Sequence, residues 1–165
     1  MQLTFRTHVE PPDREHVRRM VSSSGFFRPD EVPVAVELVT ETLEKEDASG
    51  YSFIFAEADG EPVGYACFGL IPCTLTSYDL YWIVVDDACR GRGIGIELMR
   101  RVEASVAKQG GKRIYIETST RDLYTPTRRF YEKCGYEIVA TLPDFYADND
   151  GKHIFHRSLG RIHPA

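Results

Sequence analysis

The sequence predicts an α/β (α+β) fold in which a mixed, mostly antiparallel central sheet of about seven strands carries helices on both faces. Stretches with the two-residue alternation of strands are interspersed with stretches in which apolar residues recur at helical spacing. The pair Asp59-Gly60 separates two β-rich runs and is typical of a hairpin turn. A length of 165 residues without a Gly/Ser-rich or Pro-rich linker indicates one domain over residues 1–165.

The N-terminal part is expected to form one strand and two helices. Leu3 to His8 suits a strand, and two prolines before Asp13 favour a helix that runs towards Ser22 to Gly25. A second helix is expected from Pro33 to about Asp47, because its valines and Leu43 recur on one face and its glutamates on the other.

Three strands are expected in the middle of the chain. Tyr51 to Ala58 and Pro62 to Leu70 flank the hairpin turn. Thr76 to Val85 ends in YDLYWIVV, which is apolar enough to be buried on both faces of a sheet.

The C-terminal half is expected to hold two helices and three strands. Apolar residues from Gly95 to Val106 recur at helical spacing, and Gly110-Gly111 ends that helix. A strand is expected over Arg113 to Glu117. The next helix has Thr125 as N-cap and Pro126 at its first position, and it ends at Cys134 before a left-handed Gly135. The last two strands are expected over Tyr136 to Leu142 and His153 to Leu159.

Composition and charge exclude several functional classes. With 25 acidic and 20 basic residues the net charge is −5, so neither nucleic acid nor an anionic membrane surface is an expected partner. The chain shows no apolar signal segment and no run near the ~20 apolar residues of a spanning helix, so a cytoplasmic location is expected. Four cysteines without a CxxC pair are expected to be reduced and mostly packed. His153 and His156 would point to opposite faces of a strand, so no metal site is expected.

The turn Arg90 to Gly95 lies between the most apolar strand and the most amphipathic helix. The N–H groups at the start of that helix have no partners within it, and the helix dipole adds partial positive charge, so the turn favours an anion. The string is not a P-loop, and a dinucleotide fingerprint fails because Ile96 stands where its third glycine is needed. Alternatively, the glycines only make a tight turn with solvated arginines.

Two segments together resemble a known family. RGRGIG (residues 90–95) after a buried strand resembles the acetyl-CoA diphosphate motif of the GNAT superfamily of acyl-CoA N-acyltransferases, and FYEKCGY (residues 130–136) resembles its FYxxxGF segment. The final run YADNDGKHIFHRSL is similar to the closing strands of that superfamily. The resemblance extends from about Tyr51 to Leu159.

The resemblance implies an acetyl-CoA site and no metal. The sheet would be splayed between its fourth and fifth strands, and the pantetheine arm would bond to Ile83, Val84 and Val85. The diphosphate would lie on the turn and the first helical residues, with an arginine nearby: Arg90, Gly91, Arg92, Gly93, Ile94, Gly95 and Ile96. The segment Ser119 to Thr127 departs from the family, since Tyr124 stands where many members have a cofactor-binding asparagine.

The resemblance also implies the catalytic groups. Tyr131 matches the tyrosine that protonates the leaving thiolate, although a helical tyrosine is otherwise usually a packing residue. Glu117 is the first candidate for the base that deprotonates the amine, Asp79 is the second, and a water relay is a third route. Either carboxylate could instead be a solvated strand-end residue. Cys89 or Cys134 as a covalent nucleophile is the minority mechanism, because neither has a histidine nearby in sequence.

The implied reaction is transfer of acetyl from acetyl-CoA to a primary amine, most simply that of a small molecule. The residues expected to frame the acceptor are Phe27, Arg28, Tyr78, Phe145 and Tyr146. Two alternatives stay open, a protein or peptide N-acetyltransferase and a non-catalytic acyl-CoA binding or sensing module. The sequence leaves the acceptor unidentified and a homodimer open.

Overall fold

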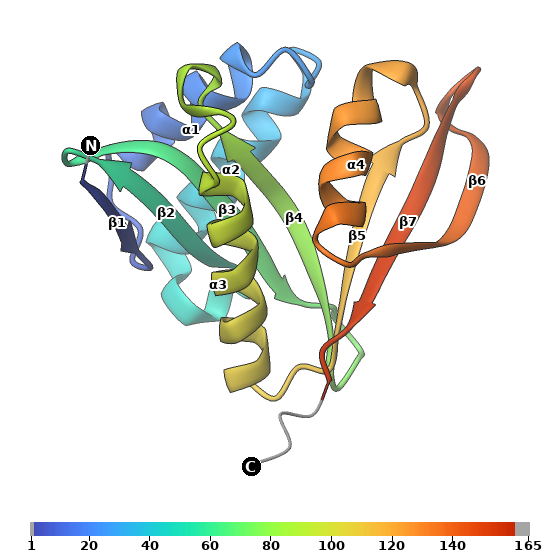
Figure 1. The fold of residues 1–165 in the computed structure, drawn as a ribbon. Helices are drawn as coiled ribbons and strands as arrows, with labels where there is room; N and C mark the ends of the chain where they lie inside the picture. The colour runs from blue at the N-terminus through green and yellow to red at the C-terminus, as the bar shows by residue number, and fades with distance from the viewer. Residues whose placement is uncertain (1, 161–165) are drawn as a thin grey trace. The chain divides into compact units, whose positions relative to one another are not determined.

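The computed structural model describes residues 2–160 of the chain (Figure 1). The described residues form two compact units. The first unit comprises residues 2–69 and 80–102, and the second comprises residues 70–79 and 103–160. The expectation of one domain over the whole chain stays a prediction.

Seven strands form one mixed sheet in the order β1-β2-β3-β4-β5-β7-β6. Their bounds are Leu3–Arg6 (β1), Ser52–Ala58 (β2), Glu61–Leu70 (β3), Ser77–Val85 (β4), Arg113–Ser119 (β5), Glu137–Ala147 (β6) and Asp150–Ser158 (β7). The pairs β1–β2, β2–β3, β5–β7 and β6–β7 are antiparallel. The pair β4–β5 is parallel and joins residues 77–79 to residues 113–115. The predicted mixed, mostly antiparallel sheet is confirmed.

The first unit packs helices on both faces of β2 and β3 (Figure 1). The helices α1 (Asp13–Ser23) and α2 (Glu31–Lys45) contribute Val17, Met20 and Val39 to a buried cluster with Phe53, Phe55 and Tyr65 of the strands. On the other face Gly64 of β3 lies against Leu98 of α3 (Ile94–Lys108). Burial of these apolar faces is the main favourable contribution to this unit's stability.

The hairpin between β2 and β3 turns where the sequence predicts it. Asp59 and Gly60 have φ angles of 52° and 90°. Two successive positive φ angles define the type I′ turn, whose twist matches that of the flanking strands. The Asp-Gly pair therefore fixes the register of β2 against β3.

The second unit is built on β5, β7 and β6, with α4 (Thr125–Lys133) against the strands. Ile114 and Ile116 of β5 and Phe155 of β7 are buried, as are Tyr131 of α4 and Tyr136 beyond it. Gly135 has a φ of 86°, so the predicted left-handed glycine after α4 is confirmed. His153 and His156 pair with Thr118 and Tyr115 respectively, which puts them on opposite faces of the sheet, as expected.

Three local expectations need correction. The residue that caps α4 is Tyr124, and Thr125 is already helical, because its hydroxyl accepts a hydrogen bond from Arg128 instead of closing the helix end. The last two strands are longer than predicted, so Asp150 and Gly151 belong to β7. Cys73 is exposed rather than packed. Among the described residues, no helix is long and apolar enough to cross a membrane.

The two glycines after α3 have different roles. Gly110 has a φ of 86° and ends the helix. A Cβ on Gly111 would lie 2.7 Å from Tyr78 Cε2 and would also meet Val106. Both of these side chains are buried, so neither has free space into which to move.

We therefore expect Gly111→Ala to lower the free energy of unfolding by about 1–3 kcal/mol, the usual cost of overpacking. Gly160→Ala is the matched control, because a Cβ there meets nothing within 4 Å. Urea unfolding of the two variants measures the difference. Equal midpoints would show that the space beside Gly111 is not limiting.

Candidate active site

The turn before α3 has the open backbone that an anion site requires. Gly91 and Gly93 have φ angles of 75° and 80°, and a Cβ on either would meet nothing within 4 Å. The first bond within α3 runs from the N–H of Glu97 to the carbonyl of Gly93 at 3.1 Å. The preceding N–H groups have no partner within the helix, and the helix dipole favours a negative charge beside them.

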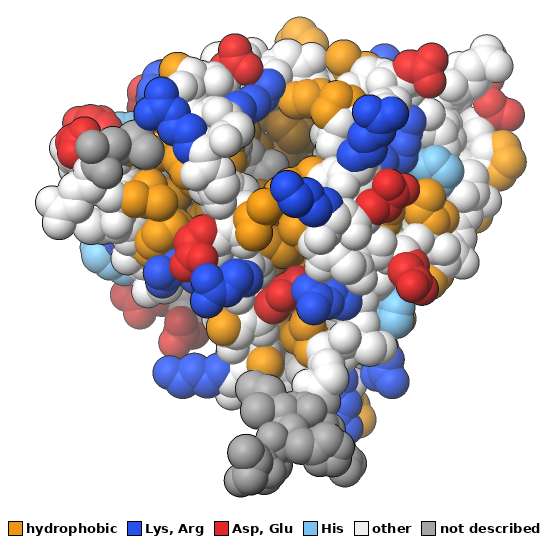
Figure 2. All heavy atoms as spheres, viewed as in Figure 1, with side chains coloured by type: hydrophobic (Ala, Val, Ile, Leu, Met, Phe, Trp, Pro, Cys, Tyr) orange, Lys and Arg blue, Asp and Glu red, His pale blue; other side chains and the backbone are white. Residues whose placement is uncertain are grey.

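Arg90 has a structural role in this turn. Its guanidinium donates to the carbonyl of Ser24 at 2.9 Å and lies 2.9 Å from the carboxylate of Asp87. It also lies over the ring of Phe26, 5.0 Å from the centroid. Arg90 thus ties the turn to the end of α1. On the face drawn in Figure 2, basic and acidic side chains are interspersed, so any attraction for an anion is local.

The end of β4 approaches the turn with one buried residue and two that are partly exposed. Val84 is buried in the apolar cluster of the first unit, while Ile83 and Val85 retain some exposure. Trp82 packs on Phe27, with 4.8 Å between ring centroids. Phe27 is therefore a packing partner of this strand.

Tyr131 lies among aromatic rings in the second unit. Its ring centroid is 5.4 Å from that of Phe155 and 6.5 Å from that of Tyr136. Burial raises the pKa of the Tyr131 phenol above its ordinary value of 10.0. The phenol stays protonated at neutral pH, but it is a weaker acid than a thiol, whose ordinary pKa is ~8.5. Tyr131 is therefore suited to donating a hydrogen bond to a thiolate.

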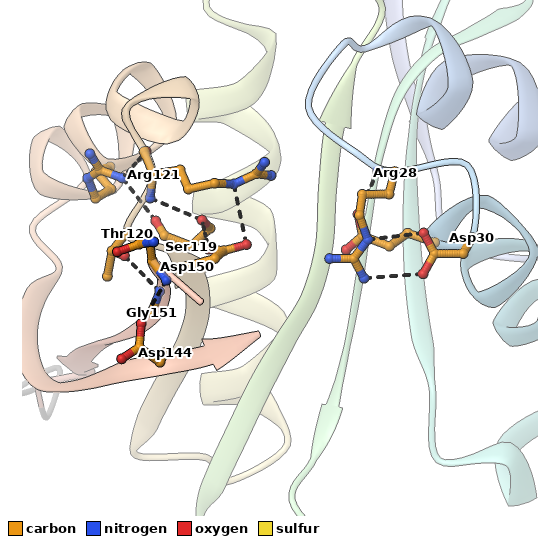
Figure 3. Close-up of polar contacts among 11 residues, drawn as sticks. Arg28, Asp30, Ser119, Thr120, Arg121, Asp144, Asp150 and Gly151 are labelled. Atoms are coloured by element: carbon orange, nitrogen blue, oxygen red, sulfur yellow. Dashed lines mark hydrogen bonds and ion pairs between the residues drawn. The ribbon is translucent and has the colours of Figure 1, made fainter. Parts of the chain in front are cut away.

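A polar network fixes the segment that leads into α4 (Figure 3). Ser119 at the end of β5 is hydrogen-bonded to Asp150 at the start of β7, and both are buried. Arg121 pairs with the same carboxylate at 3.3 Å, and its N–H donates to the Ser119 hydroxyl at 3.1 Å. Arg128 of α4 donates to the carbonyl of Ser119 at 2.9 Å. These bonds hold α4, and hence Tyr131, against the strands.

A lysine that the sequence analysis did not single out pairs with Glu117 and influences the charge of Asp79. Lys152 Nζ lies 3.0 Å from Glu117 Oε1. The side chain of Lys152 is 9% exposed, whereas that of Glu117 is 52% exposed. Burial and the nearby Glu117 carboxylate raise the pKa of Asp79 from 3.8 to about 6, and the Lys152 ammonium opposes that rise.

These charged groups lie on the face of the sheet opposite to Tyr131. Tyr131 packs on Phe155, which pairs in register with the residue before Glu117. Side chains alternate along a strand, so Glu117 points to the other face, and so does Lys152, three residues before Phe155. Asp79 pairs with the residue two positions before Glu117 and shares its face. The second unit thus separates a phenol from two carboxylates and a lysine.

The residues expected at the acceptor come from both units. Tyr78 is buried and its hydroxyl donates to Gln109 at 3.4 Å, and Arg28 forms a two-bond ion pair with Asp30, at 3.0 and 3.2 Å (Figure 3). Phe145 and Tyr146 are both more than a third exposed, with ring centroids 5.1 Å apart. The Lys152 ammonium lies 3.8 Å from the centroid of Phe145. One acceptor candidate therefore contacts the charged group, and Tyr78 belongs to the core.

The raised pKa of Asp79 makes stability depend on pH. Its folded value of about 6 exceeds the unfolded value, so proton binding favours the folded state. That contribution is fully present below pH ~4 and is lost as the pH rises through about 6. At pH 8 Asp79 is ionised, and its partly buried charge lowers the free energy of unfolding.

We expect Asp79→Asn to raise the free energy of unfolding at pH 8 by about 1 kcal/mol, a figure reduced for the partial exposure of the group. The gain should disappear below pH 4. Denaturant unfolding between pH 4 and pH 8 measures it, with the exposed Asp148→Asn as control. A gain of the same size at both ends of the range would contradict the assignment.

Comparison with known proteins agrees with the sequence motifs. The model of the acetyltransferase (GNAT) family matches residues 18–136. A structure from Desulfovibrio desulfuricans, assigned to the GNAT acetyltransferases, is 43% identical with a TM-score of 0.94, over 96% of this chain and 100% of that one. An aminoglycoside 6'-N-acetyltransferase complexed with coenzyme A has a TM-score of 0.75 at 22% identity, over 100% of both chains, which concerns the fold alone.

One curated relative matches over a shorter stretch. Blasticidin-S acetyltransferase of Streptomyces morookaense is 37% identical over 67 residues, which are 41% of this chain and 46% of that protein. This match therefore spans about half the length of that relative. The family model covers well over half of the present chain, and its residues include the glycine turn and Tyr131. The chain belongs to the acetyltransferase (GNAT) family.

Proposed function

We propose that this protein transfers the acetyl group of acetyl-CoA to the primary amine of a small molecule. The observation that carries the proposal is the glycine turn at the start of α3, where two glycines with positive φ leave open space beside N–H groups that have no partner within the helix. A relative named as a blasticidin-S acetyltransferase supports a small-molecule acceptor.

The turn suits the diphosphate of acetyl-CoA. A diphosphate needs several donors close together, and backbone N–H groups at a helix start supply them without a side chain in the way. A β-carbon at Gly91 or Gly93 would project into the same open space and force a left-handed backbone on a side-chain-bearing residue. Pantetheine would then run along Ile83 and Val85, whose side chains are partly exposed.

The chemistry needs one group to accept a proton and another to stabilise the leaving thiolate. The amine nitrogen forms a bond to the acetyl carbon, the carbon–sulfur bond breaks, and the amine proton passes to a carboxylate, Asp79 or Glu117. An alkylammonium has a pKa of ~10.4, so removal of its proton must precede attack at neutral pH. Tyr131 donates a hydrogen bond to the departing sulfur, which finally takes up a proton to give free coenzyme A.

A comparison of the affinities for acetyl-CoA and for acetyl-pantetheine separates the role of the diphosphate from that of the thioester. Acetyl-CoA at 100 times its Kd should stabilise the protein by about 2.7 kcal/mol, observed as a rise in melting temperature. Acetyl-pantetheine lacks the diphosphate and should bind at least ~100-fold more weakly, because it offers no diphosphate oxygens to the N–H groups at the start of α3. Equal affinity for the two compounds would remove the turn from the binding site.

Turnover tests the reaction and the role of Tyr131. Release of free thiol from acetyl-CoA in the presence of a panel of small amines should identify an acceptor. Tyr131→Phe should then lower kcat by about 10²-fold, with little change in acetyl-CoA affinity, because only the hydroxyl is lost.

The control is Tyr136→Phe, which removes a phenol hydroxyl that instead donates to Glu103 at 3.2 Å. An unchanged rate for Tyr131→Phe would show that water serves in place of the phenol. Turnover with peptides but not with small amines would favour a protein-modifying enzyme. Binding without any turnover would favour a sensing module.

A further inference from the structure

Lys152 is a buried cation that has no role in the proposed reaction as described above. Its side chain is 9% exposed, on β7. Its ammonium contacts the Glu117 carboxylate at 3.0 Å and the face of Phe145 at 3.8 Å from the ring centroid. A buried lysine remains charged only when it is paired, and here a carboxylate and an aromatic face supply the pairing.

The two candidate bases differ in their surroundings. The Glu117 carboxylate is half exposed and bound to Lys152, so taking up a proton would break an ion pair. Asp79 is partly buried on the same face and forms no ion pair with any cation among residues 2–160. Of the two carboxylates, Asp79 is therefore the one that can accept a proton without losing a direct ion pair.

We infer that Lys152 is a positioning residue, which neutralises Glu117 through an ion pair and thereby leaves Asp79 as the carboxylate that accepts the proton of the amine. This inference rests on the proposed acetyl transfer. A proton passes from the protonated amine to an Asp79 oxygen before the nitrogen–carbon bond forms, and then to solvent. The second proton that the nitrogen loses as the amide forms balances the proton taken up by the departing thiolate. Lys152 exchanges no proton and contacts no reacting atom in this scheme.

Several charged or titratable groups share the face of Asp79. Register places them on β5, which pairs with β4, and on β7, which pairs with β5. They are Arg113, Tyr115 and Glu117 on β5, and Lys152 and His156 on β7. Of these, Glu117 disfavours the ionised form of Asp79 and Lys152 favours it. Removal of the Glu117 charge should therefore lower the pKa of Asp79, and removal of the Lys152 charge should raise it.

The test is a titration of the free protein followed by the carboxyl carbon signal of Asp79 in NMR. In the wild type the midpoint should lie at about 6. Lys152→Met leaves the Glu117 carboxylate uncompensated and should raise the midpoint by about one pH unit. Glu117→Gln removes the opposing charge and should lower it. Lys152→Arg keeps the charge and should restore the wild-type midpoint.

The control is Lys112→Met, which removes an exposed lysine at the start of β5 and should leave the midpoint unchanged. With an acceptor identified, the acid limb of kcat/KM should move in the same direction as each midpoint. Asp79→Asn should cost at least ~10²-fold in kcat, and Glu117→Gln less.

Two outcomes would overturn the inference. The first is that Lys152→Met leaves the titration midpoint of Asp79 unchanged. The second is that Glu117→Gln lowers kcat more than Asp79→Asn does. The titration needs no substrate. If no amine is acetylated but the midpoints shift as stated, the proposed function fails while the electrostatic coupling stands. If acetylation proceeds but the midpoints do not shift, only the role of Lys152 fails.

Discussion

The N–H groups at the start of α3, which have no partners within the helix, are the constraint on which the proposed chemistry depends. A helix leaves its first N–H groups without internal partners, and something must satisfy them. Here Gly91 and Gly93 keep the space above the turn open, and Arg90 is occupied in holding the turn to α1. The proposed binding of an anionic co-substrate is therefore compatible with an acidic chain, because the donors would belong to the backbone and act locally.

In the proposed reaction, the groups that would donate and accept protons lie on opposite faces of the strands of the second unit. Tyr131 lies on the face of Phe155, and Asp79, Glu117 and Lys152 lie on the other. Burial shifts the pKa of the phenol and the pKa of Asp79 upward. The phenol thus stays protonated as a donor, and Asp79 has a pKa nearer to neutrality than an ordinary carboxyl, which suits an acceptor.

Local signals in the sequence predicted most of the fold. The Asp59-Gly60 turn and the left-handed Gly135 each follow from the conformational freedom of glycine. Strand lengths were predicted less well. The antiparallel pairing of β6 with β7 continues up to the pair Ala147–Asp150, so both strands are longer than their local sequence indicates. Nothing in the local sequence indicated that Lys152 is buried, because its partners Glu117 and Phe145 lie on two other strands, β5 and β6. The motifs located the turn and Tyr131, but the charge balance around Asp79 required the register of three strands.

The most direct measurement is a crystal structure of this protein with coenzyme A. The diphosphate oxygens should lie within hydrogen-bond distance of the backbone N–H groups between Gly91 and Ile96, and the sulfur should lie within reach of the Tyr131 hydroxyl. A diphosphate bound elsewhere, or a sulfur remote from that hydroxyl, would contradict both the binding site and the assignment of the phenol.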